Sequence, residues 1–600
     1  MNCYRTNNAT KFSHVKRHFQ LVVIFILLVN FSQNTVAQGF LRADGKKIIN
    51  DNGNVLLRGI GLGGWMLQEG YMLKIPGNGQ QHKIRERIAA LLSQQQTQEF
   101  YDTWLSNHTR KIDIDSLKSW GFNSVRLPMH YNLYTLPVED ELTGINTWIE
   151  KGFILTDSLL SWCKANRMYL VLDLHAAPGG QGNDLNISDG DSTKPSLWAS
   201  EANRRKTIAL WKKIAERYAG EQWIAGYDIL NEPNYGFTDP ENDKNGLKEE
   251  KNEPLKKLLV DITAAIREVD KKHMIIIEGN GWGNNYNGML PTWDNNMVIS
   301  FHKYWNFNDK ASIQKILDIR ENYNVPVWLG ETGENSNVWF SQAINLLETN
   351  NIGWAWWPLK KLGNNNPLEI KSNLNYEDLL KYWNGKGPKP KESNVYSGLL
   401  ELATYTRFET NIFHKDVIDA MFRQPFSSVS LPFKKHVIED SIQINATDYD
   451  LGKNGIAYFD RDTVNYRTSG KPGIGNRGRV YRNDGVDIRK DSTAYESYYV
   501  SDIENEEWLQ YTVDVRYNGI YKMQVEVAAE KEGSISITSG TKVLAKNIQI
   551  PTTGGLKKWK TIDVEKIQLK SGRQPIRIHV DQGGFNLKII RLKRIRILRN

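Results

Sequence analysis

The chain has 600 residues, 40% of them hydrophobic and 24% charged, a length that predicts two to four domains with ample material for a core. Its formal charge of +9 is small, and no motif that reads nucleic acid accompanies it, so no nucleic-acid partner is expected. The 19 Trp are the compositional outlier. Exposed indoles commonly hold sugar rings, and buried indoles in a large core are the alternative explanation.

The first 37 residues have the pattern of a secretory signal peptide. Basic residues without any acid precede the apolar run from Leu21 to Phe31, and Thr35-Val36-Ala37 offers a cleavage site. A membrane anchor is the alternative, but this run is shorter than the roughly 20 residues that a spanning helix needs. We therefore expect an exported protein, secreted or periplasmic, without stable membrane insertion. Beyond the signal Cys163 is the single cysteine, which excludes a disulfide within one mature chain.

From residue 39 to about 360, apolar strand-like runs alternate with amphipathic segments such as 203–218 and 254–271. The expected strands are Val55–Leu62, Ser124–Met129, Tyr169–His175, Ile224–Asn231, Met274–Glu278, Met297–His302, Val325–Gly330 and Gly353–Trp357. Eight strand-helix units are what a closed (β/α)8 TIM barrel, an α/β fold, requires. A doubly wound open sheet is the alternative, disfavoured because no Gly-x-Gly-x-x-Gly or P-loop motif opens the first units.

Polar and aromatic residues cluster at the carboxyl ends of six of these runs, where barrels of this kind place their active sites. They are Arg126, His130, Asp173, His175, Asn231, Glu232, His302, Lys303, Tyr304, Glu331 and Trp357. Structural need alone would distribute polar residues equally to both strand ends. The clustering therefore predicts an active site at this end of the barrel.

In their order along the chain, these residues resemble those of glycoside hydrolase family 5, a family of (β/α)8 retaining β-glycosidases. The motifs that carry the resemblance are Ser124-Val-Arg-Leu-Pro128, Leu172-Asp-Leu-His-Ala-Ala-Pro-Gly179, Asn231-Glu-Pro233, Ser300-Phe-His-Lys-Tyr304, Val327-Trp-Leu-Gly-Glu-Thr-Gly333 and Trp357. The resemblance implies that Glu232 is the general acid/base and Glu331 the nucleophile. It also implies that substrate is bound by Arg126, His175, Asn231, His302, Tyr304 and Trp357, with Asn231 on the sugar 2-hydroxyl.

The two acids fit the chemistry that the resemblance implies. Retaining glycosidases use two carboxyl groups about 5 to 5.5 Å apart, one as nucleophile and one as acid and then base. Glu232 and Glu331 would lie on the fourth and seventh strands, which face each other across a barrel mouth. A metal site built from His175, His302 and nearby acids is the competing interpretation, although no two His stand at a ligand spacing such as His-x-x-x-His. No cofactor is expected for catalysis.

The expected substrate follows from two further segments. Arg58–Trp65 and His175–Asn183 resemble the β-glucan-active branches of the family, including exo-acting β-1,3-glucanases, more than mannanases or xylanases. We therefore expect hydrolysis of a β-1,3- or β-1,4-linked glucose polymer or oligomer, and mannan or xylan is the alternative for the same fold. A non-catalytic carbohydrate-binding protein is a further alternative, disfavoured because both acids are present. We expect a monomer.

The pattern changes from alternating strands and helices to short strands near residue 430. We expect a glycosidase domain over 38–425, a linker over 426–436 where Pro and Ser gather, and an all-β, jelly-roll-like sandwich over 437–600. This last segment resembles carbohydrate-binding module family 6 through Ala446–Asp450, Gly455–Asp460, Tyr481–Ile488, Glu507–Tyr511, Pro551–Gly555 and Gly584–Leu587.

The second resemblance implies a sugar clamp formed by Tyr498, Trp559 and Asn586, in which aromatic faces stack on pyranose rings and an amide binds a hydroxyl. Core packing is the alternative for Trp559. Asn445 and Thr447 replace acids near the first strand, which leaves the structural calcium ion usual in this family as an open expectation.

Overall fold

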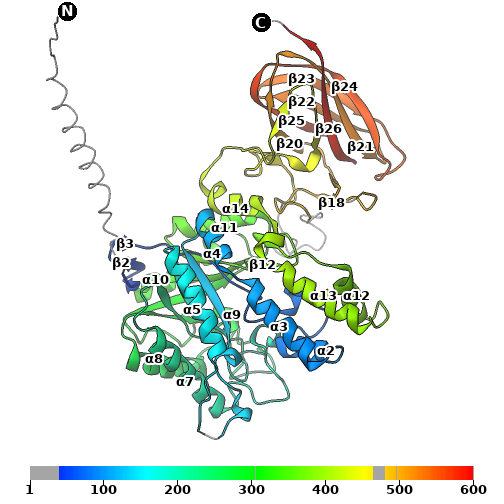
Figure 1. Cartoon of the computed structure of the whole chain (residues 1–600). Coiled ribbons are helices and arrows are strands. Elements are labelled where there is room, and N and C mark those ends of the chain that lie inside the picture. The colour runs from blue at the N-terminus through cyan, green and yellow to red at the C-terminus, as the bar shows by residue number, and fades with distance from the viewer. Residues whose placement is uncertain (1–38, 143, 305, 464–479, 495, 599–600) are drawn as a thin grey trace, which may run out of the picture. The chain divides into compact units, whose positions relative to one another are not determined.

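The structure is a computed structural model that describes residues 39–142, 144–304, 306–463, 480–494 and 496–598 (Figure 1). The predicted signal peptide lies outside these residues. In the part of the chain that the structure describes, no helix combines the length and apolar character needed to cross a membrane.

A parallel eight-stranded barrel follows a short N-terminal sheet. Its strands are β4 (Arg58–Ile60), β5 (Ser124–His130), β6 (Tyr169–Ala176), β7 (Ile224–Asp228), β8 (Met274–Glu278), β9 (Met297–Lys303), β10 (Val327–Gly333) and β11 (Gly353–Trp357). They pair in the order β4-β11-β10-β9-β8-β7-β6-β5. The barrel closes between β4 and β5, where the N–H of Leu62 donates to the carbonyl of Arg126 at 3.0 Å. The predicted fold class is confirmed.

The bounds of two strands, β8 and β11, agree with the prediction, but β7 ends at Asp228 rather than at Asn231. Past Asp228 the N–H of Asn231 donates to the carbonyl of Leu174, and Glu232 then adopts a φ of 41°. A residue with left-handed backbone cannot continue an extended strand. The turn places Glu232 at the mouth of the barrel.

Helices connect most of the strands and cover the outside of the barrel (Figure 1). The α-helices between β4 and β11 are α2 (Gln81–Ala89), α3 (Gln94–His108), α4 (Lys111–Trp120), α5 (Glu150–Ala165), α6 (Leu185–Ser188), α7 (Glu201–Tyr218), α8 (Glu253–Val269), α9 (Asn280–Gly283), α10 (Gln314–Tyr323) and α11 (Asn337–Thr349). The single turns α6 and α9 lie at the carboxyl ends of the strands and are not part of this cover. The two helices predicted at 203–218 and 254–271 correspond to α7 and α8. The connection from β8 to β9 departs from regular alternation, because α9 is only one turn long and contains the left-handed residues Gly281 and Trp282.

The N-terminal sheet covers the end of the barrel where the parallel strands begin. It consists of β1 (Arg42–Asp44), β2 (Lys47–Asn50) and β3 (Gly53–Asn54). Leu41 and Ile48 pack into one apolar cluster with Tyr169 and Met274, the first residues of β6 and β8. The amino-terminal end is thereby filled with apolar side chains, and the carboxyl ends are left for the site.

The segment after the barrel packs back on it. It contains the helices α12 (Leu374–Trp383), α13 (Glu392–Tyr405) and α14 (Lys415–Phe422), with the short strands β12 (Lys360–Lys361), β13 (Leu368–Glu369) and β14 (Ile412–Phe413). Helix α13 contacts α3, and α14 contacts α11.

Among the described residues, two six-stranded sheets form the C-terminal part. The strands are β15 (His436–Ile438), β16 (Ser441–Asn445), β17 (Tyr458–Phe459), β18 (Ile488–Lys490), β19 (Tyr498–Val500), β20 (Trp508–Val515), β21 (Gly519–Ala529), β22 (Gly533–Ser539), β23 (Lys542–Ile550), β24 (Lys560–Leu569), β25 (Gly572–Gln582) and β26 (Phe585–Ile597). Alternate residues of β21, including Tyr521, Met523 and Val525, are buried in one core with side chains of both sheets. This period of two identifies a sandwich, as predicted. The domain limits at 38–425, 426–436 and 437–600 stay predictions.

Candidate active site

A cavity of about 740 Å³ opens at the carboxyl ends of the barrel strands. Six of the eight predicted barrel residues line it, namely His175, Glu232, His302, Tyr304, Glu331 and Trp357. The other two, Arg126 and Asn231, are completely buried. The fold therefore brings the predicted residues together, but two of them contact the lining residues rather than the cavity.

Glu331 lies on β10 and accepts hydrogen bonds from two side chains. Nη1 of Arg126 donates to Oε1 at 2.6 Å, and the hydroxyl of Tyr304 donates to Oε2 at 2.9 Å. Burial raises the pKa of Tyr304 well above its ordinary value, so the hydroxyl keeps its proton and acts as a donor. A carboxylate held by two donors at the wall of a cavity suits a nucleophile.

Glu232 stands in a different environment. Its side chain accepts a hydrogen bond at 2.6 Å from Nδ1 of His302. Burial raises the pKa of Glu232 to about 7, although the hydrogen bond and the charge of His302 act in the opposite direction. Near neutral pH this carboxyl can therefore give up a proton and later take one back, which is the behaviour of a general acid and base.

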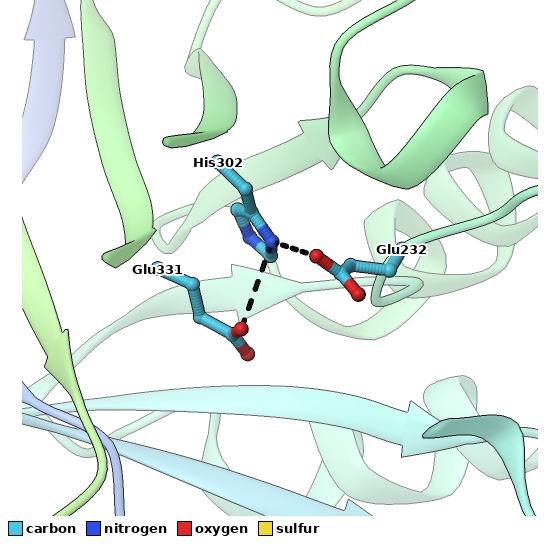
Figure 2. A group of neighbouring side chains, drawn as sticks. All are labelled: Glu232, His302 and Glu331. Carbon is cyan, nitrogen blue, oxygen red and sulfur yellow. Dashed lines mark hydrogen bonds and ion pairs between the residues drawn. The ribbon is translucent and has the colours of Figure 1, made fainter. Parts of the chain in front are cut away.

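His302 stands between the two acids, as Figure 2 shows. Its Nδ1 lies 3.7 Å from Oε2 of Glu331. Burial disfavours the charged ring, but the carboxylates of Glu278 and Glu331 outweigh burial and raise the pKa of His302 well above its ordinary value. Nδ1 of the ring donates its hydrogen to the carboxyl of Glu232.

The separation of the two acids decides which chemistry they can perform. One oxygen of Glu232, one of Glu331 and a ring nitrogen of His302 all lie within 4.8 Å of one another. Retaining glycosidases hold their carboxyl groups about 5 to 5.5 Å apart, whereas inverting enzymes hold them about 6.5 to 9.5 Å apart. Among the described residues this is also the one cluster that could hold a metal ion, so the competing metal site would use His302 and not His175.

Arg126 joins the buried groups beneath the cavity. Besides Glu331 its guanidinium contacts Asp228 and Asn231 at 2.9 Å, Glu278 at 3.0 Å and Asp173 at 3.3 Å. Burial disfavours its charge, but the surrounding carboxylates raise the pKa of Arg126 well above its ordinary value. Removing one partner from such a buried network typically costs about 3 to 5 kcal/mol, so the network fixes the residues above it.

His175 and Asn231 form a neutral pair beside this network. Nδ1 of His175 lies 2.8 Å from Oδ2 of Asp173. Burial lowers the pKa of His175 to about 3, so the ring is neutral and its Nε2 accepts from the amide of Asn231 at 3.3 Å. The amide oxygen of Asn231 accepts from Arg126. Both ends of Asn231 are thus engaged by the protein, and its contact with a sugar hydroxyl stays a prediction.

Trp357 forms one wall of the cavity. Its ring stacks on His175 with centroids 5.1 Å apart and an angle of 8°, and its Nε1 donates to the hydroxyl of Tyr71 at 2.9 Å. A Cβ atom at Gly61 or Gly63 would lie 2.5 or 2.6 Å from the indole. Gly61 and Gly63, which follow β4, are therefore required because Trp357 approaches their backbone closely.

Three functional candidates were missed by sequence reasoning. Glu278 ends β8 and is completely buried, and the rule that singled out the other strand ends could have found it. Glu69 lines the cavity, and none of the described residues hydrogen-bonds its carboxyl, whose pKa is raised well above its ordinary value by burial. Trp282 lines the cavity from the left-handed turn of α9. For Glu69 and Trp282 the sequence offered no local signal.

In the C-terminal sandwich, the three predicted clamp residues have different surroundings. The ring of Tyr498 contacts that of Tyr481 with centroids 4.9 Å apart and a tilt of 30°. Trp559 instead contacts Tyr499, the neighbour of Tyr498 on β19, with centroids 5.1 Å apart. Because successive strand residues point to opposite faces, this arrangement favours different faces for the two rings. Asn586 is buried and donates to the carbonyl of Leu556 at 2.7 Å. A joint clamp stays a prediction, as does the calcium ion.

Comparison with known proteins identifies both halves of the chain. Residues 87–363 match the family model Cellulase (glycosyl hydrolase family 5), and residues 479–594 match Carbohydrate binding module (family 6). A β-xylosidase of Phanerodontia chrysosporium is 27% identical over 57% of this chain and 75% of its own length. A glucan 1,3-β-glucosidase of Candida oleophila is 24% identical over 49% of this chain and 68% of its own.

A further sequence relative and a solved structure match this chain over different fractions of their lengths. Endoglucanase C of Acetivibrio thermocellus is 26% identical over 35% of this chain, which spans only about half (52%) of that protein. The crystal structure of a β-glucanase from Saccharophagus degradans superimposes with a TM-score of 0.37 at 16% identity, covering 61% of this chain and 94% of that one.

The family match and these relatives make the chain a glycoside hydrolase that acts on β-glycans, and the barrel with its two neighbouring carboxyl groups suits that class. More particularly, residues 87–363 belong to glycoside hydrolase family 5 and residues 479–594 to family 6 of the carbohydrate-binding modules.

Proposed function

We propose that this protein is an exported, retaining β-glycosidase that hydrolyses a β-glucan with Glu331 as nucleophile and Glu232 as acid and base. The observation that carries the proposal is the pair itself. Oxygens of the two carboxyl groups lie within 4.8 Å, one group accepts from Arg126 and Tyr304, and the other has a pKa of about 7. These opposite environments match the two roles that double displacement requires.

In the first step an oxygen of Glu331 attacks the anomeric carbon. The glycosidic C–O bond breaks, its electron pair stays on the leaving oxygen, and the proton of Glu232 is transferred to that oxygen. A glycosyl ester of Glu331 remains. In the second step water attacks the anomeric carbon, Glu232 takes the proton of that water, and the ester electron pair returns to Glu331. Neither step needs a cofactor.

A β-glucan is supported by the relatives named endoglucanase and glucan 1,3-β-glucosidase, together with the resemblance of Arg58–Trp65 to glucan-active branches. A β-xyloside is the second candidate, because a β-xylosidase matches over 75% of its own length. In both cases the C-terminal module would hold the enzyme on polymer, and the signal pattern at residues 1–37 supports export.

The test is a panel of β-1,3-, β-1,4- and mixed-linkage glucan, xylan and mannan with matched aryl β-glycosides, each assayed with and without a chelator. We expect hydrolysis of a glucan that survives chelation. Cleavage of xylan alone would identify a β-xyloside, the second candidate, as the substrate. Activity that a chelator abolishes and zinc restores would favour the metal site. Hydrolysis of none of them would refute the proposal.

A further inference from the structure

Glu278 holds the acid/base glutamate from two directions. It is the last residue of β8, and its side chain is completely shielded from solvent. Oε2 accepts the backbone N–H of Glu232 at 2.7 Å. Oε1 lies 3.2 Å from Nε2 of His302, whose Nδ1 hydrogen-bonds the Glu232 carboxyl at 2.6 Å. One carboxylate thus contacts the main chain of Glu232 and the ring that orients its side chain.

This double contact stabilises an unusual backbone conformation at Glu232. Glu232 has a φ of 41°, which is strained for a residue with a side chain and persists only when its surroundings enforce it. The loop after β8 adds further contacts, because the N–H of Trp282 donates to the carbonyl of Pro233 at 3.1 Å. The side chain of Asn280 also bonds the N–H and the carbonyl of Tyr235, at 2.9 and 2.8 Å. The turn after β7 is therefore fixed by the end of β8.

Two other buried acids provide a comparison. Asp173 and Asp228 contact the same guanidinium of Arg126 and are equally shielded from solvent. In the described part of the chain, no hydrogen bond or ion pair joins either of them to Glu232 or His302, although the charge of His302 acts on the pKa of Asp173 from a greater distance. Glu278 thus differs from them in contacting both.

We propose that Glu278 is the positioning residue for the acid/base glutamate, acting through the backbone amide of Glu232 and through the imidazole of His302. The inference rests on the proposed role of Glu232. Its consequence is specific to proton delivery, because a shift of about 1 Å in a catalytic group can lower a rate roughly 100-fold.

Glu331 accepts from Arg126 and Tyr304, and Glu278 reaches it through Arg126, which it contacts at 3.0 Å. Asp228 contacts the same guanidinium, so a loss of support for Glu331 should also occur in Asp228→Asn, whereas a loss of proton delivery should not.

The experiment compares Glu278→Ala and Glu278→Gln with the matched variant Asp228→Asn. For each we measure kcat/KM on two β-glycosides of the same sugar, one with phenol and one with 2,4-dinitrophenol as leaving group. This quantity reports the step that forms the glycosyl-enzyme. Phenol needs a proton to leave, whereas dinitrophenolate leaves without one, so the pair separates proton delivery from nucleophilic attack.

Glu278→Ala should lower kcat/KM about 100-fold or more on the phenyl glycoside and less than about 10-fold on the dinitrophenyl glycoside. Glu278→Gln keeps one oxygen that can accept the N–H of Glu232 but loses the charge beside His302, so its loss should be smaller with the same substrate dependence. It also keeps the shape of the side chain and carries the test alone if the alanine variant does not fold. Asp228→Asn should lower both rates by similar factors.

Equal losses on both substrates in the Glu278 variants, or a phenyl rate within about threefold of wild type, would overturn the inference. Such a result would leave the proposed function intact, because the wild type would still hydrolyse both glycosides. Absence of hydrolysis by the wild type would instead refute the proposed function.

Discussion

The pKa of Glu232 predicts how the rate falls at alkaline pH. Only the protonated carboxyl can donate to the leaving oxygen, and burial sets its pKa at about 7 in the free enzyme. The proton is present below this pH and is lost as the pH rises through 7. At pH 9 roughly 1 molecule in 100 keeps it, so kcat/KM on a substrate with a poor leaving group should be about 100-fold below its value near pH 6.

The assay is kcat/KM between pH 5 and 10 on a phenyl β-glycoside, repeated on the dinitrophenyl analogue. The alkaline fall should be much smaller for the dinitrophenyl substrate, because its leaving group needs no proton. A flat phenyl profile up to pH 9 would refute the assignment of the raised pKa to the acid. Falls of equal size on both substrates would place the titration on another group.

Three more predictions follow from individual contacts. Tyr304→Phe removes the 2.9 Å hydrogen bond to Glu331 and should lower kcat/KM about 10- to 100-fold, since a hydrogen bond to a charged group contributes about 1.5 to 3 kcal/mol; unchanged steady-state rates would contradict this. Trp282→Ala should raise KM for oligosaccharides several-fold while phenyl glycoside hydrolysis stays near normal, and an unchanged KM would show that this indole does not contact substrate. Trp559→Ala should weaken retention of the full chain on insoluble glucan without changing aryl glycoside rates, and full retention would assign Trp559 to packing.

The order of elements could be predicted because each is encoded locally. Short apolar runs, each bounded by turn residues, predicted the eight barrel strands. Two of them, β8 and β11, have the predicted bounds. The end of β7 could not be predicted, because it depends on the left-handed turn at Glu232, which contacts from β8 enforce. The one-turn helix α9 could not be predicted either. It replaces a regular helix in the loop after β8, where the side chain of Asn280 hydrogen-bonds the turn after β7.

The sequence predicted which residues gather at the site, but not which of them line the cavity and which are buried beneath it. Strand ends identified six of the residues that line the cavity. Arg126 and Asn231 were expected to bind substrate, but the fold buries both under the lining residues, where Arg126 donates to Glu331 and to Asn231. Glu278 was overlooked because its importance comes from contacts with the backbone of another strand. Such contacts depend on how the strands are staggered around the barrel, which a single sequence does not reveal.

The central claim, that Glu331 is the nucleophile of a retaining reaction, is tested most directly by trapping the intermediate. A 2-deoxy-2-fluoro β-glycoside with a good leaving group slows breakdown of the glycosyl-enzyme, and mass spectrometry of its peptides locates the sugar. We predict one sugar per chain, attached to the peptide that contains Glu331. A sugar on another residue, or turnover with no covalent adduct and inversion of the anomeric centre, would contradict the account.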